Sequence, residues 1–230
     1  MKHPGYVITL EGPEGSGKSS QARWLVQALR RGGRRVVFVH DPGTTSLGKC
    51  LRNVLLHERL TAISPMSEAL LCIAGRVQLV EERIRPALAR GAVVVCDRFH
   101  DSTMAYQGYG GRLNIAWLNR LGREAINGLM PDLTILLDLP PAKGLQRVKG
   151  RKDRMERKAL TFHQRVRRGF LSLAHREPRR FLVLDATQPK VDIHAHIFSV
   201  VLSRLPHGLA YSGQRRAVRK KSPSTLNAQR

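Results

Sequence analysis

Gly12-Pro13-Glu14-Gly15-Ser16-Gly17-Lys18-Ser19 is the stretch of sequence that decides the fold. It matches the G-x-x-x-x-G-K-[ST] pattern of phosphate-binding loops. Glycines let the backbone wrap closely around a polyphosphate, with several N–H groups directed at the anion. Lys18 adds an ammonium group for the terminal phosphates, and the Ser19 hydroxyl is suited to ligate Mg²⁺. The predicted nucleotide contacts are Gly12, Pro13, Glu14, Gly15, Ser16, Gly17, Lys18, Ser19 and Ser20.

The flanks of this loop have the setting that phosphate binding requires. Residues 6–10 form a short β-branched run that predicts a strand. In residues 20–31, apolar side chains recur at helical spacing, which predicts a helix whose positive end faces the loop. Strand, glycine loop and helix in this order indicate a nucleotide-binding α/β protein.

Composition bounds the class of protein. The chain has 230 residues, of which 42% are hydrophobic, enough for one domain with a full core. No stretch approaches the length of a membrane span, and residues 1–5 lead straight into a strand without room for a secretory signal. Cys50, Cys72 and Cys96 lack metal-ligand spacing, so we expect reduced thiols in a cytoplasmic protein without membrane insertion.

The net charge of +23 is the unusual feature of the composition. Such a field favours polyanions such as nucleotides and nucleic acids. Much of the charge lies in residues 143–168, where only Asp153 and Glu156 are acidic, and in a tail without acids. We therefore expect a domain over residues 1–206 and a basic, disordered tail over 207–230 that contacts nucleic acid non-specifically.

Buried strands and helices alternate along the rest of the chain. This alternation predicts a doubly wound parallel sheet. Further strands are expected at residues 35–39, 92–96, 133–139 and 180–185, with helices at 47–56, 65–85, 87–90, 101–107, 115–126, 160–175 and 193–205.

Several separated motifs, in the right order, resemble the bacterial type of thymidylate kinase over nearly the whole chain to about Leu205. Besides the loop and the residue before it, the motifs are Asp41-Pro42-Gly43-Thr44-Thr45, 74–81, 84–88, Asp97-Arg98-Phe99, 102–108, Pro131-Asp132-Leu133-Thr134 and 185–189.

The resemblance implies a P-loop NTPase-type three-layer α/β/α fold with a five-stranded parallel sheet and a short lid at about 143–158. It also implies transfer of the γ-phosphoryl group of ATP to dTMP, with Mg²⁺, by a homodimer. The resemblance further implies that Lys18 acts on the donor phosphates, Ser19 and Asp97 on the metal, and Asp41 on the metal through water. Arg98 would grip the acceptor phosphate, for which a planar, bidentate, permanently charged group is suited.

For the acceptor nucleoside, the resemblance implies that Glu14 accepts a hydrogen bond from the 3′-OH of the sugar. Arg76 would bind thymine O4, while Thr103, Tyr106 and Gln107 line the same pocket. Tyr106 would exclude a 2′-OH by bulk. The stretch Thr187-Gln188-Pro189 would border adenine, with Gln188 in contact.

Phosphoryl transfer needs cations at the transferred oxygens. In the bacterial type the loop lacks an internal arginine, and Gly15 occupies that place here. The lid must then supply the cation. The candidates are Arg147, Arg151 and Arg154, of which Arg151 and Arg154 are expected to close over ATP.

The chain departs from the family pattern at the acceptor base. Cys72 stands where the family has a phenylalanine that stacks on thymine, and His40 replaces an arginine. Losing a stacking partner loosens the base pocket. Two alternatives therefore stay open at this point. One is a kinase for another nucleoside monophosphate or a deoxynucleoside, and the other is a non-catalytic, nucleotide-dependent nucleic-acid-binding module.

Overall fold

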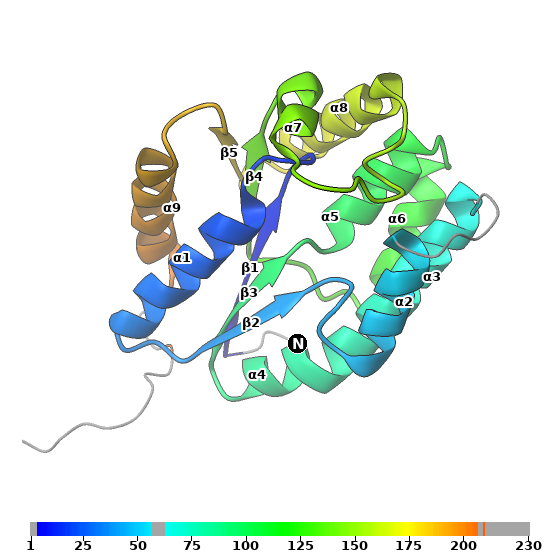
Figure 1. The fold of residues 1–230 in the computed structure, drawn as a ribbon. Helices are drawn as coiled ribbons and strands as arrows, with labels where there is room; N and C mark the ends of the chain where they lie inside the picture. Colours follow the sequence, from blue (N-terminus) through cyan, green and yellow to red (C-terminus); the bar gives the residue numbers. More distant parts are fainter. Residues whose placement is uncertain (1–3, 57–62, 207–208, 210–230) are drawn as a thin grey trace, which may run out of the picture.

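The computed structural model describes residues 4–56, 63–206 and 209, so nearly all of the predicted basic tail lies outside the described residues. Over the described ranges the chain forms a five-stranded sheet with helices on both faces (Figure 1). The strands are β1 (Tyr6–Glu11), β2 (Val36–His40), β3 (Val93–Asp97), β4 (Leu133–Asp138) and β5 (Phe181–Asp185). The helices are α1 (Lys18–Arg31), α2 (Ser46–Leu56), α3 (Pro65–Leu79), α4 (Arg85–Ala89), α5 (His100–Thr103), α6 (Ile115–Ala125), α7 (Pro141–Arg147), α8 (Leu160–Arg176) and α9 (Lys190–Arg204).

All neighbouring strands run parallel, in the order β2-β3-β1-β4-β5. The central strand β1 pairs on both sides, with Ile8 opposite Val95 of β3 and Leu133 of β4. The connection after β1 runs toward the β2 edge of the sheet, whereas the connection after the neighbouring strand β3 runs the opposite way to β4. Parallel α/β sheets bind ligands at the carboxyl ends of the strands beside such a switch point. The three-layer fold and the parallel sheet predicted from the sequence are confirmed.

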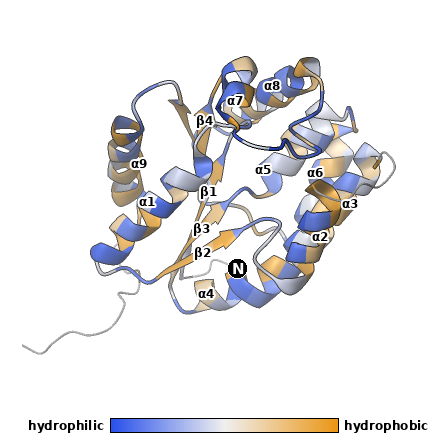
Figure 2. Ribbon diagram, viewed as in Figure 1, coloured by the Kyte–Doolittle hydropathy of each residue, from blue (hydrophilic) through white to orange (hydrophobic). Residues whose placement is uncertain are grey.

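The core lies on both faces of the sheet. On one face Ile8 belongs to an apolar cluster with Leu25 of α1 and Ile197 of α9. On the other face Val94 packs in a cluster with Leu79 of α3. Figure 2 shows largely apolar strands between helices that carry both polar and apolar residues. Burial on both faces explains why the strands are continuous apolar runs rather than alternating ones.

The helices differ from the expected ones at two π-helical turns. The predicted helix over 65–85 ends as an α-helix at Leu79, passes through a π turn at Val80–Ile84 and continues as α4. Pro86 lies in the first turn of α4, where its missing N–H is tolerated. The predicted helix over 101–107 begins at His100 and widens into a second π turn at Met104–Gly110. Ser102, Thr103, Tyr106 and Gln107 of this segment line the cavity described below.

Helix α7 was not expected from the sequence, because its basic residues obscured the pattern. The predicted lid, at about 143–158, covers most of α7 and the irregular stretch 148–158 that follows it, and its boundaries stay a prediction. None of the helices within the described ranges is both long enough and apolar enough to cross a membrane.

Candidate active site

The phosphate-binding loop connects β1 to α1 at the carboxyl edge of the sheet. Gly17, just before α1, has a φ of 92°, which favours glycine. A side chain at Gly12 is excluded, because its Cβ would lie 2.5 Å from the carbonyl oxygen of Leu137. Lys18 Nζ donates to Pro13 O at 2.7 Å and to Ser16 Oγ at 3.3 Å, closing the loop on itself. Burial lowers the pKa of Lys18 to about 8.

A cavity of about 830 Å³ opens beside the loop. It extends from the start of α1 and the β5–α9 connection to α3 and the π turn after α5. Most of the residues predicted from the sequence meet here, including Lys18, Asp97, Arg98, Arg76, Cys72 and Gln188. The cavity is large enough for a donor and an acceptor at once.

Ser19 and Asp97 come together from α1 and β3. Ser19 Oγ donates to Asp97 Oδ2 at 2.5 Å. Burial opposes ionisation of Asp97, but its hydrogen bonds and nearby charges, His40 above all, lower its pKa. Asp97 Oδ1 is buried and has no hydrogen-bond partner in the described part of the chain. An ionised carboxylate with an unpaired oxygen beside a hydroxyl offers the oxygen ligands that Mg²⁺ prefers.

Arg98 follows β3 in a left-handed conformation, with a φ of 68°. Its guanidinium is held at several points: Nη1 donates to Gly12 O at 3.2 Å and Ser102 Oγ at 3.1 Å. Nη2 donates to both oxygens of Glu14 at 3.3 Å and to the hydroxyl oxygen of Tyr106 at 3.2 Å. The Tyr106 hydroxyl in turn donates to Glu14 Oε1 at 2.6 Å. Three predicted acceptor-site residues therefore form one charged cluster.

Glu11, at the end of β1, accepts hydrogen bonds from two residues next to this cluster. It was not among the predicted site residues. Its Oε1 accepts the Phe99 N–H at 2.7 Å, and its Oε2 accepts the Ser102 hydroxyl at 2.6 Å. Burial, reinforced by the charge of Asp101, raises the pKa of Glu11 to about 8. Both hydrogen bonds hold residues that follow the left-handed backbone of Arg98.

Arg76 lies at the opposite end of the cavity and is almost fully buried. Its Nε donates to Asp41 Oδ2 at 2.6 Å, and its Nη2 donates to Thr103 Oγ1 at 2.7 Å and Phe99 O at 3.2 Å. Its Nη1 has no hydrogen-bond partner among the described residues. Asp41, expected near the metal, is therefore the ion-pair partner of Arg76 in this structure. The pair leaves two buried polar atoms without hydrogen-bond partners among the described residues, the donor Arg76 Nη1 and the acceptor Asp41 Oδ1, and both residues line the cavity.

Gln107 lines the same end of the cavity. Its Nε2 donates to Glu68 Oε2 at 2.9 Å, whereas its Oε1 is buried without a hydrogen-bond partner in the described ranges. Glu68, on α3, was missed from the sequence. The available signal was an acidic side chain in the first turn of an otherwise apolar helix.

Cys72 lines the cavity one helical turn before Arg76, as its spacing predicts. Burial raises the pKa of the Cys72 thiol to about 12, so the side chain is neutral. A small neutral group therefore stands beside the unused donor of Arg76. None of the three cysteines forms a disulfide within the described residues.

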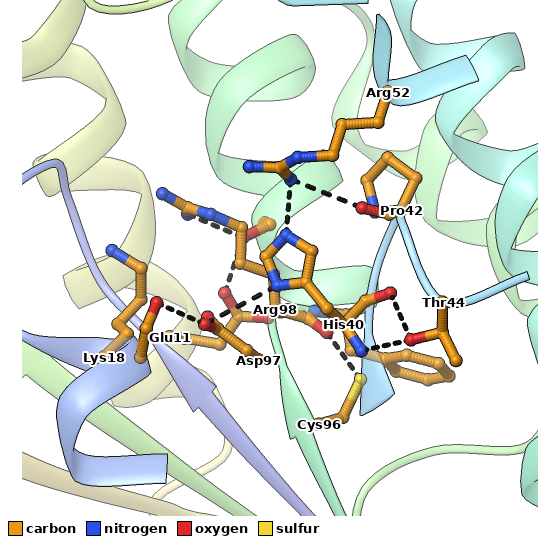
Figure 3. Close-up of polar contacts among 12 residues, drawn as sticks. Glu11, Lys18, His40, Pro42, Thr44, Arg52, Cys96, Asp97 and Arg98 are labelled. Atoms are coloured by element: carbon orange, nitrogen blue, oxygen red, sulfur yellow. Dashed lines mark hydrogen bonds and ion pairs between the residues drawn. The ribbon is translucent and has the colours of Figure 1, made fainter. Parts of the chain in front are cut away.

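Arg52 and His40 form a second connection that sequence analysis did not predict (Figure 3). Arg52 reaches from α2 into the cavity, where its Nη1 contacts His40 Nε2 and donates to Pro42 O at 3.3 Å. His40 Nδ1 lies 3.5 Å from Asp97 Oδ2. Arg52 is thus a second cation near Arg98. Its signal in the sequence is an arginine on an amphipathic helix directly after the polar loop at the end of β2.

The three candidate lid arginines lie apart from one another. Arg147 lines the cavity and its Nη1 donates to Ala186 O at 3.0 Å. Arg151 is exposed. Arg154, expected over the donor, instead donates to Glu68 Oε1 at 2.6 Å and to Leu55 O at 2.7 Å on the acceptor side. Segment 148–159 is therefore joined to α2 and α3, and the donor-side role of Arg154 stays a prediction.

Gly15 cannot carry a cation of its own. A Cβ at this position, where φ is 66°, would lie 2.2 Å from the carbonyl oxygen of Gly144 in α7. The start of the loop and α7 therefore touch through two glycines. A cationic side chain at position 15 is therefore excluded by the close contact with α7.

Comparison with known proteins identifies the family. The thymidylate kinase family model matches residues 10–197. The chain belongs to the thymidylate kinase family. A thymidylate kinase of Deinococcus radiodurans is 51% identical over 202 residues, covering 87% of this chain and 98% of the relative. One of Synechococcus sp. strain JA-2-3B'a(2-13) is 48% identical over 207 residues, covering 90% of this chain and 98% of the relative.

A solved structure shares the fold of this thymidylate kinase family member. The crystal structure of thymidylate kinase from Ehrlichia chaffeensis superimposes with a TM-score of 0.71 at 31% identity. The match covers 86% of this chain and 98% of that chain. The resemblance expected from the separated motifs is confirmed.

Proposed function

We infer that this chain transfers the γ-phosphoryl group of ATP to dTMP, giving dTDP and ADP. This inference rests on one observation: a single cavity has two ends, each lined by residues suited to bind a different part of the substrates. One end has a phosphate-binding loop, and the other has an unused buried donor on Arg76 and an unused buried acceptor on Gln107. Membership of the thymidylate kinase family agrees with it and does not favour the two alternatives left open by the sequence.

On the donor side, we propose that residues 12–20 bind the ATP phosphates. The backbone N–H groups of the loop and the start of α1 favour the anion. Lys18 already points back into the loop, so ATP phosphate oxygens replace its contacts with Pro13 and Ser16. Gln188 lines the cavity at the β5–α9 connection, where adenine fits.

Mg²⁺ fits beside Ser19 and Asp97. When bound, it would neutralise charge that builds up on the donor phosphates. Ser19 Oγ and the unpaired Oδ1 of Asp97 are the oxygen atoms that would hold the ion or its water molecules. The lowered pKa of Asp97 keeps this carboxylate ionised for that purpose.

On the acceptor side, Arg98 and Arg52 are the cations that we assign to the dTMP phosphate. Arg98 is held rigidly by Glu14 and Tyr106, so little order is lost when the phosphate binds. The acceptor phosphate is already anionic near neutral pH. The reaction therefore needs positioning and charge stabilisation rather than a general base.

Glu14 and Tyr106 are the side chains that we assign to the deoxyribose. The charges of Arg98 and Lys18 overcome the effect of burial and lower the pKa of Glu14, so its carboxylate accepts hydrogen bonds. The Tyr106 ring lies beneath Arg98, with the guanidinium carbon 5.0 Å from the ring centre. A ring held in this way leaves little space for a 2′-OH.

Thymine matches the unused groups at the far end of the cavity. Its O4 accepts a hydrogen bond, and its N3–H donates one. We assign O4 to Arg76 Nη1 and N3–H to Gln107 Oε1, with Thr103 holding Arg76 in place. Cys72 borders the base without stacking on it.

The cation for the transferred phosphoryl group is proposed to come from the lid at about 143–158. Arg147 already lines the cavity, whereas Arg154 must leave Glu68 to reach the donor. A lid arginine would stabilise the charge on the γ-phosphoryl oxygens as they transfer. Arg151 is exposed and able to swing inward with segment 148–159.

The oligomeric state and the cellular location of the protein are further proposals. We propose a cytoplasmic homodimer that uses the α2–α3 face, where three large apolar side chains are exposed: Leu47, Met66 and Leu70. Contact with nucleic acid through the basic tail stays a prediction.

The experiment is a panel of nucleoside monophosphates and deoxynucleosides with ATP and Mg²⁺, followed through ADP release. We expect dTMP to be phosphorylated with the highest kcat/KM. Faster turnover of another acceptor would replace dTMP as the substrate. Salt-sensitive DNA or RNA binding without any monophosphate turnover would support the non-catalytic alternative.

A further inference from the structure

The amide of Gln107 has a defined orientation. Its side chain is 4% exposed, and its NH₂ group donates to Glu68 at 2.9 Å. Gln107 lines the cavity, and its carbonyl oxygen is buried without a hydrogen-bond partner among the residues that the structure describes. A buried polar atom without a partner is costly unless a ligand supplies one. The oxygen is therefore an acceptor that a bound molecule can use.

Glu68 decides which end of that amide faces the cavity. Its carboxylate is 1% exposed and receives two cations on Oε1, Arg154 Nη1 at 2.6 Å and Lys158 Nζ at 2.9 Å. Burial opposes ionisation, but hydrogen bonds from Gln107 and these cations lower the pKa of Glu68. An ionised carboxylate accepts hydrogen bonds and donates none. Gln107 must then turn its NH₂ group toward Glu68 and its oxygen toward the cavity.

We propose that Glu68, by holding Gln107 in this orientation, is a positioning residue that makes the acceptor pocket select thymine and uracil against cytosine. This rests on the proposed function of the cavity as the dTMP site. Thymine and uracil carry an N–H at N3, which the Gln107 oxygen accepts. Cytosine carries a lone pair at N3, so two acceptors would face each other in a buried site. A site built to pair with one hydrogen-bond pattern rejects the opposite pattern strongly.

Arg76 reads the neighbouring position of the base independently of Glu68. Its guanidinium is held by Asp41 and Thr103, at 2.6 and 2.7 Å, and neither contact involves Glu68. A change at residue 68 should therefore leave recognition of O4 intact. Uracil shares both N3–H and O4 with thymine, so discrimination between these two bases should not depend on Glu68.

The test is Glu68→Gln in the full-length protein, with dTMP, dUMP and dCMP as acceptors. An uncharged amide at 68 can donate as well as accept, which frees Gln107 to turn over. We expect the dTMP-to-dCMP ratio of kcat/KM to fall at least about tenfold, while the dTMP-to-dUMP ratio stays the same. The same ratios are measured from Kd values by calorimetry, which needs no turnover. A wild type that binds dTMP without phosphorylating it would contradict the proposed function but not this proposal.

Two control variants distinguish two roles of Glu68, which are orienting the Gln107 amide and anchoring segment 148–159. Lys158→Gln removes one cation from Glu68 Oε1 and leaves the contact with Gln107, so the dTMP-to-dCMP ratio should not change. In a Gln107→Leu background, Glu68→Gln should cause no further fall, because the residue through which Glu68 acts is gone. An equal fall in Lys158→Gln, or a full additional fall in the Gln107→Leu background, would overturn the proposal.

Glu68→Asp guards against a variant that does not fold. It keeps the negative charge for Arg154 and Lys158 but shortens the side chain, so contact with Gln107 is lost. We expect the same loss of discrimination against dCMP in this variant. An unchanged dTMP-to-dCMP ratio in a folded Glu68→Gln or Glu68→Asp protein would show that Glu68 does not set the base preference.

Discussion

Ser19 Oγ lies 2.5 Å from Asp97 Oδ2, which joins the first turn of α1 to the carboxyl end of β3. The two residues are 78 positions apart in the sequence. Only the parallel pairing of β1 with β3 brings them together, with Leu10 opposite Asp97. Loss of the Asp97 carboxylate should therefore affect the metal requirement before it affects the fold.

Asp97→Asn should raise the Mg²⁺ concentration needed for half-maximal activity by about tenfold or more. The amide keeps the shape of the side chain but loses the charge that attracts the ion. Activity is measured against Mg²⁺ at saturating ATP and dTMP, and circular dichroism checks the fold. An unchanged Mg²⁺ requirement would remove Asp97 from the metal site.

Lys18→Ala should lower kcat by about a thousandfold or more, because a preorganised cation at the donor phosphates is lost. The fold should survive, since the hydrogen bonds of the Lys18 ammonium within the described part of the chain go to Pro13 O and Ser16 Oγ of its own loop. Thermal unfolding and turnover are measured on the same preparation. Substantial kinase activity in the folded variant would contradict the role of the loop.

Arg52→Ala should raise the KM for dTMP by about tenfold or more, the usual effect of losing a charged hydrogen bond. The KM for ATP should change little, because Arg52 lies on the acceptor side of the cavity. Lys49→Ala is the matched control, since it removes an exposed cation from the same helix. Equal effects of the two substitutions would mean that general charge, not phosphate contact, explains the result.

Cys72→Phe should lower the KM for dTMP, because an aromatic ring beside Arg76 can stack on the base. Stacking on nucleic-acid bases contributes about 1–3 kcal/mol, so a decrease of several fold is expected. Steady-state kinetics with dTMP as the varied substrate measure it. An unchanged or higher KM would argue against contact of residue 72 with the base.

Glu11→Gln should flatten the dependence of stability on pH. The pKa of Glu11 is raised from 4.5 to about 8 in the folded protein, so the folded state binds an extra proton between these values. The contribution of this group to stability is therefore complete below about pH 4.5 and is lost as pH rises through about 8. Its slope is at most about 1.4 kcal/mol per pH unit.

Urea unfolding at pH 5, 6.5 and 8 measures this effect. The free energy of unfolding of the wild type should contain a contribution that falls toward pH 8. That of Glu11→Gln should lack this contribution, because the amide does not ionise. If both proteins show the same slope, Glu11 does not carry a buried proton.

Local sequence was sufficient to predict a glycine-rich loop between a strand and a helix. These elements are contiguous, so spacing along the chain alone put Lys18 and Ser19 at the junction of loop and helix, where the structure has them. The separated motifs, in their order along the chain, were sufficient to predict the family. The π turns were not predictable from periodicity, because a change from i→i+4 to i→i+5 hydrogen bonds over a single turn hardly alters the spacing of apolar residues.

The acceptor half of the site could be predicted only in part, because it depends on contacts between elements that are far apart in the sequence. Glu68, Arg52 and Glu11 lie in segments whose local patterns resemble ordinary helices and strands. Arg154 was assigned to the donor because of its place in a basic stretch, whereas its observed partner lies 86 residues away.

The sequence by itself determined the nucleotide-binding loop, the parallel α/β fold and the family, because each depends on residues close together in the chain or on ordered motifs. Only the tertiary structure decided which charges are paired and which polar atoms remain unused. Pairing depends on the sheet order and on how α2, α3 and segment 148–159 pack. For the same reason the orientation of the Gln107 amide, which depends on its hydrogen bond to Glu68, is decided by the tertiary structure and not by local sequence.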